Sequence, residues 1–404
     1  MQAIDKNHIP VVRLAVILGA LATFGPFGTD MYLSGFPAIA AHFGTSVASV
    51  QMSLSVYFFG LAAGQMIYGP LVDRFGRRKP LLAGLTLFTI SSLLVIFAPN
   101  IECFIALRLL QALGGCSGMI VGRAVVSDLF DLRGSANFLS MLAVVQGLGP
   151  IIAPIAGSFI LTVSVWQGVF VFITFFGLAC LAASAFGLPE TLPAEKRRAS
   201  GAADIARDYL AVLSRRAFIV PALAGAFAAS SLFAYIVGSP FVFMHIYGVG
   251  AGTYGLIFAG NAAGTILSAQ VNRLLLRRHS PQSIMVGAML FNIAAITALL
   301  LMAGRTPMWA FMIPLWFSVA TMPLMFANSI ALAMTAARDR AGSASALVGL
   351  LQFGLASLSS SAVSLLDNGK AWPMAAVMFC GVGLGLVTHF AFSRSPETPA
   401  SRIG

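Results

Sequence analysis

The chain consists mainly of apolar runs long enough to cross a lipid bilayer, separated by short polar segments. A membrane-spanning helix needs about 20 predominantly apolar residues. Charged residues make up only 9% of the 404, whereas roughly a quarter is usual in a soluble domain. We therefore predict an all-α membrane protein with about twelve transmembrane helices. The expected spans lie near residues 12–38, 50–70, 80–98, 102–125, 137–160, 168–188, 217–240, 252–275, 281–303, 308–334, 343–366 and 372–393.

The distribution of basic residues predicts the orientation of the chain in the membrane. The 24 Lys and Arg outnumber the 13 Asp and Glu, a balance that in a soluble protein suggests nucleic-acid binding. Here the cations gather in short segments between the apolar runs instead. If the N-terminus is cytoplasmic, all of them except Arg108, Arg305 and Lys370 belong to cytoplasmic segments, as the positive-inside rule expects. We expect a multi-pass protein of the bacterial cytoplasmic (inner) membrane with both termini cytoplasmic and no nucleic-acid partner.

The longest hydrophilic segment, residues 189–216, divides the apolar runs six and six. Internal similarity supports a duplication, because Arg-Gly-Ser-Ala at 133–136 has a counterpart in Ala-Gly-Ser-Ala at 341–344. We expect an N-terminal six-helix half at 1–190, a cytoplasmic linker at 191–216 and a C-terminal six-helix half at 217–404, working as a monomer.

One polar turn carries the most specific pattern in the chain. Residues 64–80, GQMIYGPLVDRFGRRKP, leave an apolar run, pass through an acid and four cations, and re-enter apolar sequence. One helix ends here, the backbone turns at Gly76, and Asp73 is placed to accept hydrogen bonds from Arg77 or from the start of the next helix. We interpret this turn as a conformational latch made of Gly69, Asp73, Arg74, Gly76, Arg77 and Arg78.

The latch resembles the signature loop between the second and third helices of the major facilitator superfamily, G-x-L-x-D-R-x-G-R-R. The resemblance implies two six-helix halves that enclose a central cavity and give alternating access by rocking. In the second half the corresponding position holds Asn272, followed by Arg273, Arg277 and Arg278. We therefore expect any ionic latch to be stronger in the first half.

Asp30 is the clearest candidate for proton coupling, because a polar group inside a span is costly. It lies in FGPFGTDMYLSGFPAIA, where Gly25, Pro26 and Gly28 are expected to loosen the first helix. An isolated carboxylate there costs roughly 2.5–3.5 kcal/mol, and desolvation favours the protonated form. The alternative is a carboxylate that reaches the outer interface or caps a short loop, since Asp30 lies in the outer half of its span.

Arg108 is the one cation placed well inside a predicted span, in FIALRLLQALGGCSG. The pattern L-x-x-R-x-x-Q-x-x-G/A, completed by Gln111 and Gly114, resembles the fourth-helix signature of proton-coupled members of the superfamily. The resemblance implies that this arginine couples substrate and proton occupancy as a fixed charge, since a guanidinium does not lose its proton in practice. The alternative is a structural arginine that binds carbonyls at a helix end.

The fifth span, VVQGLGPIIAPIAGSF, is a stripe of small residues with two helix breakers. It resembles, in relaxed form, the antiporter signature G-x-x-x-G-P-x-x-G-G, and the resemblance implies export. Small residues allow close helix packing and prolines permit bending, so ordinary packing without directional meaning is the alternative. The motif residues are Gly147, Gly149, Pro150, Pro154 and Gly157.

Longer segments resemble the bicyclomycin/chloramphenicol-resistance (Bcr/CflA) branch of drug:proton antiporters. These are SLFAYIVGSPFVFMHIYGVGAGTYGLIFAGNAAG at 231–264, AGSASALVGLLQFGLASL at 341–358 and TDMYLSGFPAIA in the first span, with Ser34 where that branch usually has Pro. Together they cover both halves and nearly the whole chain. They do not specify a substrate, since the branch handles chemically diverse compounds.

A mostly apolar cavity with few hydrogen-bonding groups is expected between the halves. Such a surface suits varied amphipathic ligands better than a sugar, which needs a dense set of polar groups. The candidate lining residues are Tyr57, Gln111, Gln146, Phe233, Tyr235, Phe241, Asn261 and Gln352.

We therefore expect a proton-coupled drug efflux transporter; the alternative is a proton-coupled exporter or importer of an endogenous metabolite. A membrane enzyme or a metal site needs gathered histidines and acids, but the five histidines are scattered. No charge ring or carbonyl filter of a channel and no ATP-binding loop is visible in the sequence. The four cysteines fit as small core residues, so we expect no cofactor, no metal and no enzymatic activity.

Overall fold

A computed structural model describes residues 11–130, 132–197, 202–303 and 306–393, and all the regular secondary structure within these ranges is helical. Both chain termini lie outside the described residues. So do five cations that the sequence assigns to loops or termini: Lys6, Arg198, Arg305, Arg394 and Arg402.

The first part of the chain forms long helices after a broken first segment. The elements are α1 (Val11–Ala22), α2 (Phe24–Asp30), the short 3-10 helix η1 (Leu33–Gly35), α3 (Phe36–Phe43), α4 (Val47–Phe75), α5 (Arg78–Val95), α6 (Ile101–Leu129), α7 (Leu132–Val163) and α8 (Gln167–Gly187).

A connecting segment and a second set of helices follow. The elements are η2 (Ala194–Lys196), α9 (Ala202–Leu213), α10 (Arg216–Pro240), the π-helix η3 (Phe241–Ile246), α11 (Ala251–Leu275), α12 (Pro281–Met302), α13 (Met308–Ala320), α14 (Met322–Ala336), η4 (Arg338–Arg340), α15 (Ala341–Leu365) and α16 (Trp372–Ser393).

The predicted spans agree with these helices in number and place. Among the described residues, eleven helical segments are long and apolar enough to cross a membrane. The remaining predicted span corresponds to α11, a 25-residue helix whose polar Asn261, Gln270 and Asn272 make it less apolar than the others. Several helices run beyond the predicted limits; α4, for example, continues through Asp73 to Phe75. The all-α membrane fold is therefore confirmed.

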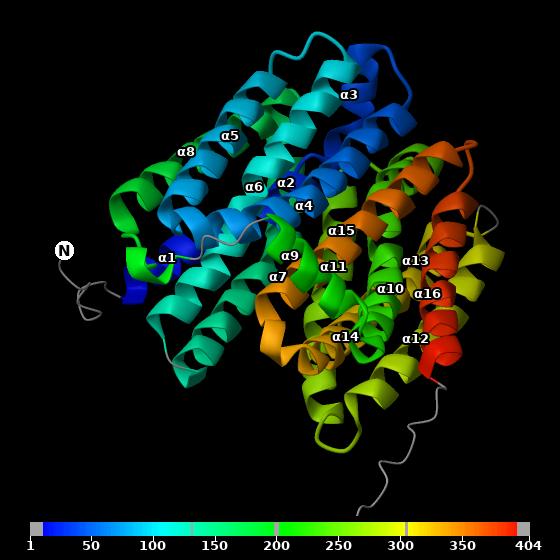
Figure 1. The fold of residues 1–404 in the computed structure, drawn as a ribbon. Coiled ribbons are helices and arrows are strands. Elements are labelled where there is room, and N and C mark those ends of the chain that lie inside the picture. Colours follow the sequence, from blue (N-terminus) through cyan, green and yellow to red (C-terminus); the bar gives the residue numbers. More distant parts are fainter. Residues whose placement is uncertain (1–10, 131, 198–201, 304–305, 394–404) are drawn as a thin grey trace, which may run out of the picture.

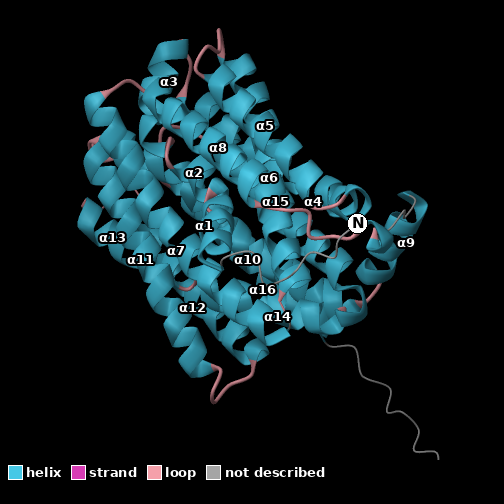
Figure 2. Ribbon diagram, turned by 90° about the vertical axis from the view of Figure 1, so that its left-hand side faces the viewer, coloured by secondary structure: helices cyan, strands magenta, loops and turns pink. Residues whose placement is uncertain are grey.

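The helices form two groups that lie side by side (Figure 1). Helices α1 to α8 make up one group and α10 to α16 the other, with α9 beside the junction. The groups meet along two seams, where α4 packs against α15 and α7 packs against α11. Figure 2 shows the same packing from the side.

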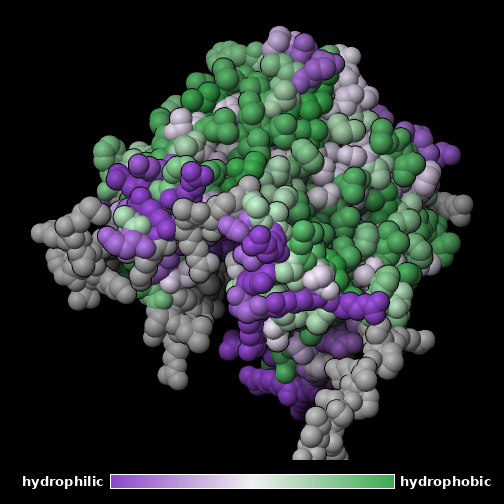
Figure 3. Space-filling view, in the orientation of Figure 1, coloured by the Kyte–Doolittle hydropathy of each residue, from purple (hydrophilic) through white to green (hydrophobic). Residues whose placement is uncertain are grey.

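The two ends of the helix bundle differ in their polarity. We call the end formed by residues 73–79, 188–197, 202–216, 276–280 and 337–341 the basic end, and the opposite end, which includes residues 44–46 and 96–100, the distal end. Figure 3 shows apolar residues over most of the visible face, with hydrophilic residues concentrated where α9 and α14 lie.

Candidate functional site

The first span is broken around Asp30. Pro26 has no N–H to donate to the carbonyl of Ala22, where α1 ends, and the chain restarts as the seven-residue α2. Asp30 ends α2 with a side chain only 3% exposed. Its hydrogen-bond partner is the Thr29 hydroxyl, which donates to Oδ1 over 2.7 Å. The buried position is inconsistent with a carboxylate that reaches the outer interface.

Asp30 has no counter-ion among the described residues. The segment that follows it, η1, packs against α7 of the first helix group and against α10 and α11 of the second. The acid therefore lies close to the contact between the two groups.

Arg108 is fully buried in the first helix group and binds backbone rather than an acid. Its Nη2 donates to the Gly28 carbonyl over 2.5 Å, and Nη1 donates to Gln111 Oε1. The guanidinium carbon lies 4.2 Å from the ring centre of Tyr32 and 4.3 Å from that of Tyr57, a sandwich that stabilises the cation. These are the contacts expected of a structural arginine. The coupling role remains a prediction.

The small residues of α7 permit close contact with the broken first span. A Cβ added to Gly157 would lie 1.8 Å from the Met31 carbonyl oxygen, and one added to Gly149 would lie 2.7 Å from Pro26 Cγ. A Cβ at Gly147 would instead meet nothing nearer than Ile266 at 3.8 Å. Two of the predicted motif glycines thus hold α7 against the segment that carries Asp30.

The eight predicted cavity residues lie in several different surroundings among the described residues. Some lie in packed polar or aromatic contacts: Gln111 donates to Ser92 within the first helix group, and Tyr235 accepts a 2.9 Å hydrogen bond from Asn261. Gln146, Phe241 and Gln352 line three separate hollows, and Phe233 packs edge-on against Phe58 with ring centres 4.7 Å apart.

The halves are in contact toward the distal end. Gln51 of α4 donates to the Val237 carbonyl of α10 over 3.1 Å, and both groups are buried. The Phe58–Phe233 contact lies between the same two helices. A hollow of about 760 Å³ near His42 and Trp166 has a mostly apolar lining without Asp, Glu, Lys or Arg.

At the basic end a cavity of about 520 Å³ lies between α4, α6, α9 and the start of α15. Its lining combines apolar groups with charged ones. The charged lining residues are Asp73, Arg123, Asp208, Asp339 and Arg340. A volume in this range suits a drug-sized molecule.

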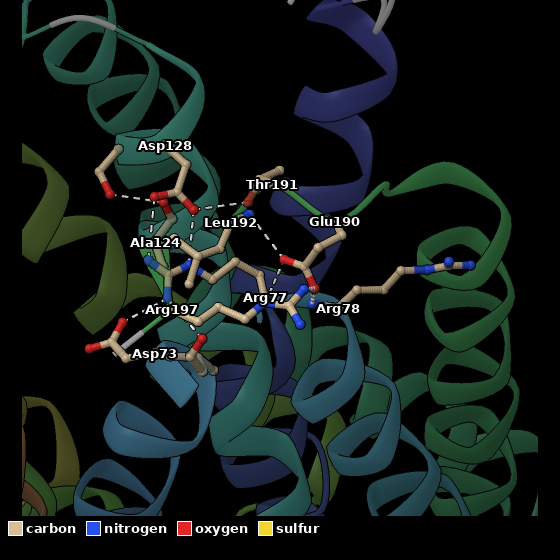
Figure 4. Close-up of polar contacts among 11 residues, drawn as sticks. Asp73, Arg77, Arg78, Ala124, Asp128, Glu190, Thr191, Leu192 and Arg197 are labelled. Carbon is tan, nitrogen blue, oxygen red and sulfur yellow. Dashed lines mark hydrogen bonds and ion pairs between the residues drawn. The ribbon is translucent and has the colours of Figure 1, made fainter. Parts of the chain in front are cut away.

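The Asp73–Arg77 pair of the predicted latch lies at this end, and Arg77 also binds an acid that the sequence did not reveal (Figure 4). Arg77 Nη1 donates to Asp73 Oδ1 over 2.7 Å, as predicted, while its Nε donates to Asp128 Oδ2 over 2.9 Å. Thr191 donates to the same Asp128 oxygen over 2.9 Å. Burial opposes the charged form of Arg77, but the hydrogen bonds to Asp128 and Asp73 raise the pKa of its guanidinium. We call Asp73, Arg77, Asp128 and Thr191 the Arg77 clamp.

Glu190, also missed from the sequence, holds the turn from the connecting segment. Its carboxylate accepts the backbone N–H of Arg77 over 2.8 Å and that of Arg78 over 3.3 Å, satisfying donors at the start of α5. Gly76 adopts φ +87°, and a Cβ there would lie 2.2 Å from Glu190 Oε2. Glycine is therefore required both for the turn and for the approach of Glu190.

The second half contains an uncharged counterpart of the clamp. Asn328 of α14 donates to Asn272 Oδ1 of α11 over 2.8 Å, and both side chains are buried. In the sequence pattern, Asn272 takes the position that Asp73 has in the first half. An amide pair thus stands where the first half has an ionic network.

Comparisons with known proteins agree with this architecture. Residues 18–361 match the Major Facilitator Superfamily. The chain is 34% identical to an uncharacterized transporter of this type, YdgK of Bacillus subtilis, over 95% of this chain and 96% of that protein. It is 28% identical to the bicyclomycin resistance protein homolog of Haemophilus influenzae, over 92% of this chain and 94% of that protein. It is 32% identical to the multidrug resistance protein MdtL of Escherichia coli O157:H7, over 70% of this chain and 71% of that protein.

Solved structures share the fold at low sequence identity. A D-xylose-proton symporter superposes with a TM-score of 0.73 at 14% identity, covering 94% of this chain and 97% of the other. The nucleoside transporter NupG gives 0.72 at 15% identity, covering 95% and 99%.

The helical architecture and the family match define a membrane transporter of small molecules, not an enzyme. The chain belongs to the Major Facilitator Superfamily. Its named relatives agree with the Bcr/CflA branch indicated by the sequence.

Proposed function

We propose that this protein is a proton-driven exporter of small, largely apolar molecules, with its basic end facing the cytoplasm. The observation that carries the proposal is Asp30, a buried acid in a broken span whose hydrogen-bond partner among the described residues is a neutral hydroxyl. Such a carboxylate is costly to keep ionised in the membrane, which makes proton binding favourable.

In this mechanism the protein binds the proton and the substrate in alternation, and the two cross the membrane in opposite directions. Substrate enters from the basic-end cavity. Binding of a proton at Asp30 removes a buried charge from the broken first span. Arg108 supplies a fixed positive charge at the neighbouring Gly28 carbonyl. The Arg77 clamp ties the ends of α4, α5 and α6 together within the first half, so that this half can rock as a unit against the second.

The direction of transport is supported by the relatives and by α7. Two relatives are named for resistance to bicyclomycin or to multiple drugs, which is the phenotype of export. The close packing of α7 on the first span fits the antiporter signature. One proton moving through about 150 mV releases roughly 3.5 kcal/mol, enough for about a 300-fold gradient of a neutral substrate.

The test is drug accumulation in bacteria that lack their own exporters, across an antibiotic panel. Cells with the wild-type protein should accumulate less of its substrates than cells with Asp30→Asn at equal membrane abundance, and a protonophore should abolish the difference. Accumulation above the level of empty cells would identify an importer. Protonophore-resistant export would contradict proton coupling.

A further inference from the structure

Among the described residues, Arg123 is the charged residue of the basic-end cavity lining that has no charged partner. The acids of this lining all have arginine partners: Asp73 pairs with Arg77 at 2.7 Å, Asp208 with Arg340 at 3.3 Å, and Asp339 with Arg215 at 2.5 Å. Two of these arginines also lie near a second acid, since Arg77 pairs with Asp128 and Arg340 lies 3.9 Å from Asp339. Within the described residues, Arg123 is therefore the charged lining residue whose charge no direct ion pair balances.

Arg123 has no direct partner within the described chain. Its side chain makes no hydrogen bond or ion pair with the described residues, while the acids of the same lining are paired with other arginines. It projects from the part of α6 near the basic end, and its side chain is exposed to the cavity. A cation that is exposed to a cavity and has no partner within the described chain is available to a ligand.

Arg123 also lies where a ligand can reach it. It lines the 520 Å³ cavity and a second hollow of about 210 Å³ between α1, α6 and α7. Around it are Leu18, Met119 and Leu142, together with the amide of Gln146. An apolar wall with one guanidinium and one amide fits an amphipathic molecule that carries a single acidic group.

We propose that Arg123 binds an anionic group of the substrate, such as a carboxylate, sulfonate or phosphate on an apolar body. This inference rests on the proposed export function and specifies its substrate class. A guanidinium presents a planar set of donors that matches these oxyanions. The same charge disfavours organic cations, which would meet an unpaired positive charge without a nearby free acid.

The test compares two probes with the same body, anilinonaphthalene sulfonate and the neutral N-phenylnaphthylamine. Binding to the full-length protein in phosphatidylcholine nanodiscs is measured by equilibrium dialysis, with empty nanodiscs subtracted. Arg123→Gln should weaken sulfonate binding by about tenfold or more, the loss expected for a charged hydrogen bond, and leave the neutral probe unchanged. Arg123→Lys should retain part of the affinity.

Arg207→Gln is the matched control, because it removes an equal charge from exposed α9 outside the cavity lining. It should leave both probes unchanged. Unaltered sulfonate binding in Arg123→Gln, or equal loss of both probes, would overturn the proposal. If only the Arg123 proposal fails, protonophore-sensitive export of neutral drugs should still be observed. If the proposed export function fails, this export should be absent although the probes still bind.

Discussion

The two acids of the Arg77 clamp should contribute very differently to stability. Asp128 has a side chain only 17% exposed, whereas Asp73 is 56% exposed. Losing a buried charge-assisted hydrogen bond costs about 1.5–3 kcal/mol, while an exposed helical ion pair contributes about 0.3–0.5 kcal/mol. Asp128→Asn should therefore destabilise the protein several times more than Asp73→Asn.

Thermal unfolding of the purified protein measures this difference. At about 2–4 °C per kcal/mol for a unit of this size, Asp128→Asn should lower the midpoint by roughly 3–12 °C. Asp73→Asn should lower it by about 2 °C or less. High salt should erase the small Asp73 effect, because exposed pairs are screened, and preserve the Asp128 effect.

The control is Asp204→Asn, which removes an exposed partner of Arg207 on α9, away from the clamp. It should leave the midpoint nearly unchanged. Equal shifts for Asp73→Asn and Asp128→Asn would refute the reasoning, since it assigns the strength of the clamp to burial.

Further perturbations test the neighbouring contacts. Gly157→Ala should lower the free energy of unfolding by about 1–3 kcal/mol through overpacking against the Met31 carbonyl, which would be seen as a reduced folded yield. Gly147→Ala is the matched variant and should be tolerated. Similar losses of folded protein in the two variants would contradict this packing. Glu190→Ala should lower the unfolding midpoint, because two backbone donors at the start of α5 lose their acceptor. An unchanged midpoint would mean that water fully replaces the Glu190 carboxylate as acceptor. Arg108→Ala should abolish efflux, and Arg108→Lys should retain a fraction of it. Lysine keeps the charge but lacks the planar guanidinium that binds Gly28 and Gln111. Efflux by Arg108→Ala at the wild-type rate would show that the charge is dispensable.

The spans and the turn at Gly76 were predictable because each depends on local sequence. Bilayer-length apolar runs specify helices, and a glycine between an acid and an arginine specifies a tight turn. The Asp73–Arg77 pair lies within this local pattern, and it was predicted correctly.

The partners that come from distant segments were not predictable in the same way. Asp128 lies at the end of α6 and Glu190 follows α8, so only the packing of α4, α5, α6 and α8 brings them to Arg77. An acid near a helix end gives no sequence signal for such a contact. The surroundings of the eight candidate cavity residues were hard to predict for a related reason: the direction in which each side chain points depends on helix rotation, which hydropathy alone does not fix.

The most direct test of the account is whether substrate binding releases a proton from Asp30. Purified protein in weakly buffered detergent receives a substrate that has no titrating group near neutral pH, and a pH indicator records the response. The wild type should release at most about one proton for each bound molecule, as expected for a single exchanging carboxyl, and Asp30→Asn should bind the substrate without proton release. Equal proton release by the two proteins would contradict the assignment of Asp30 as the coupling site.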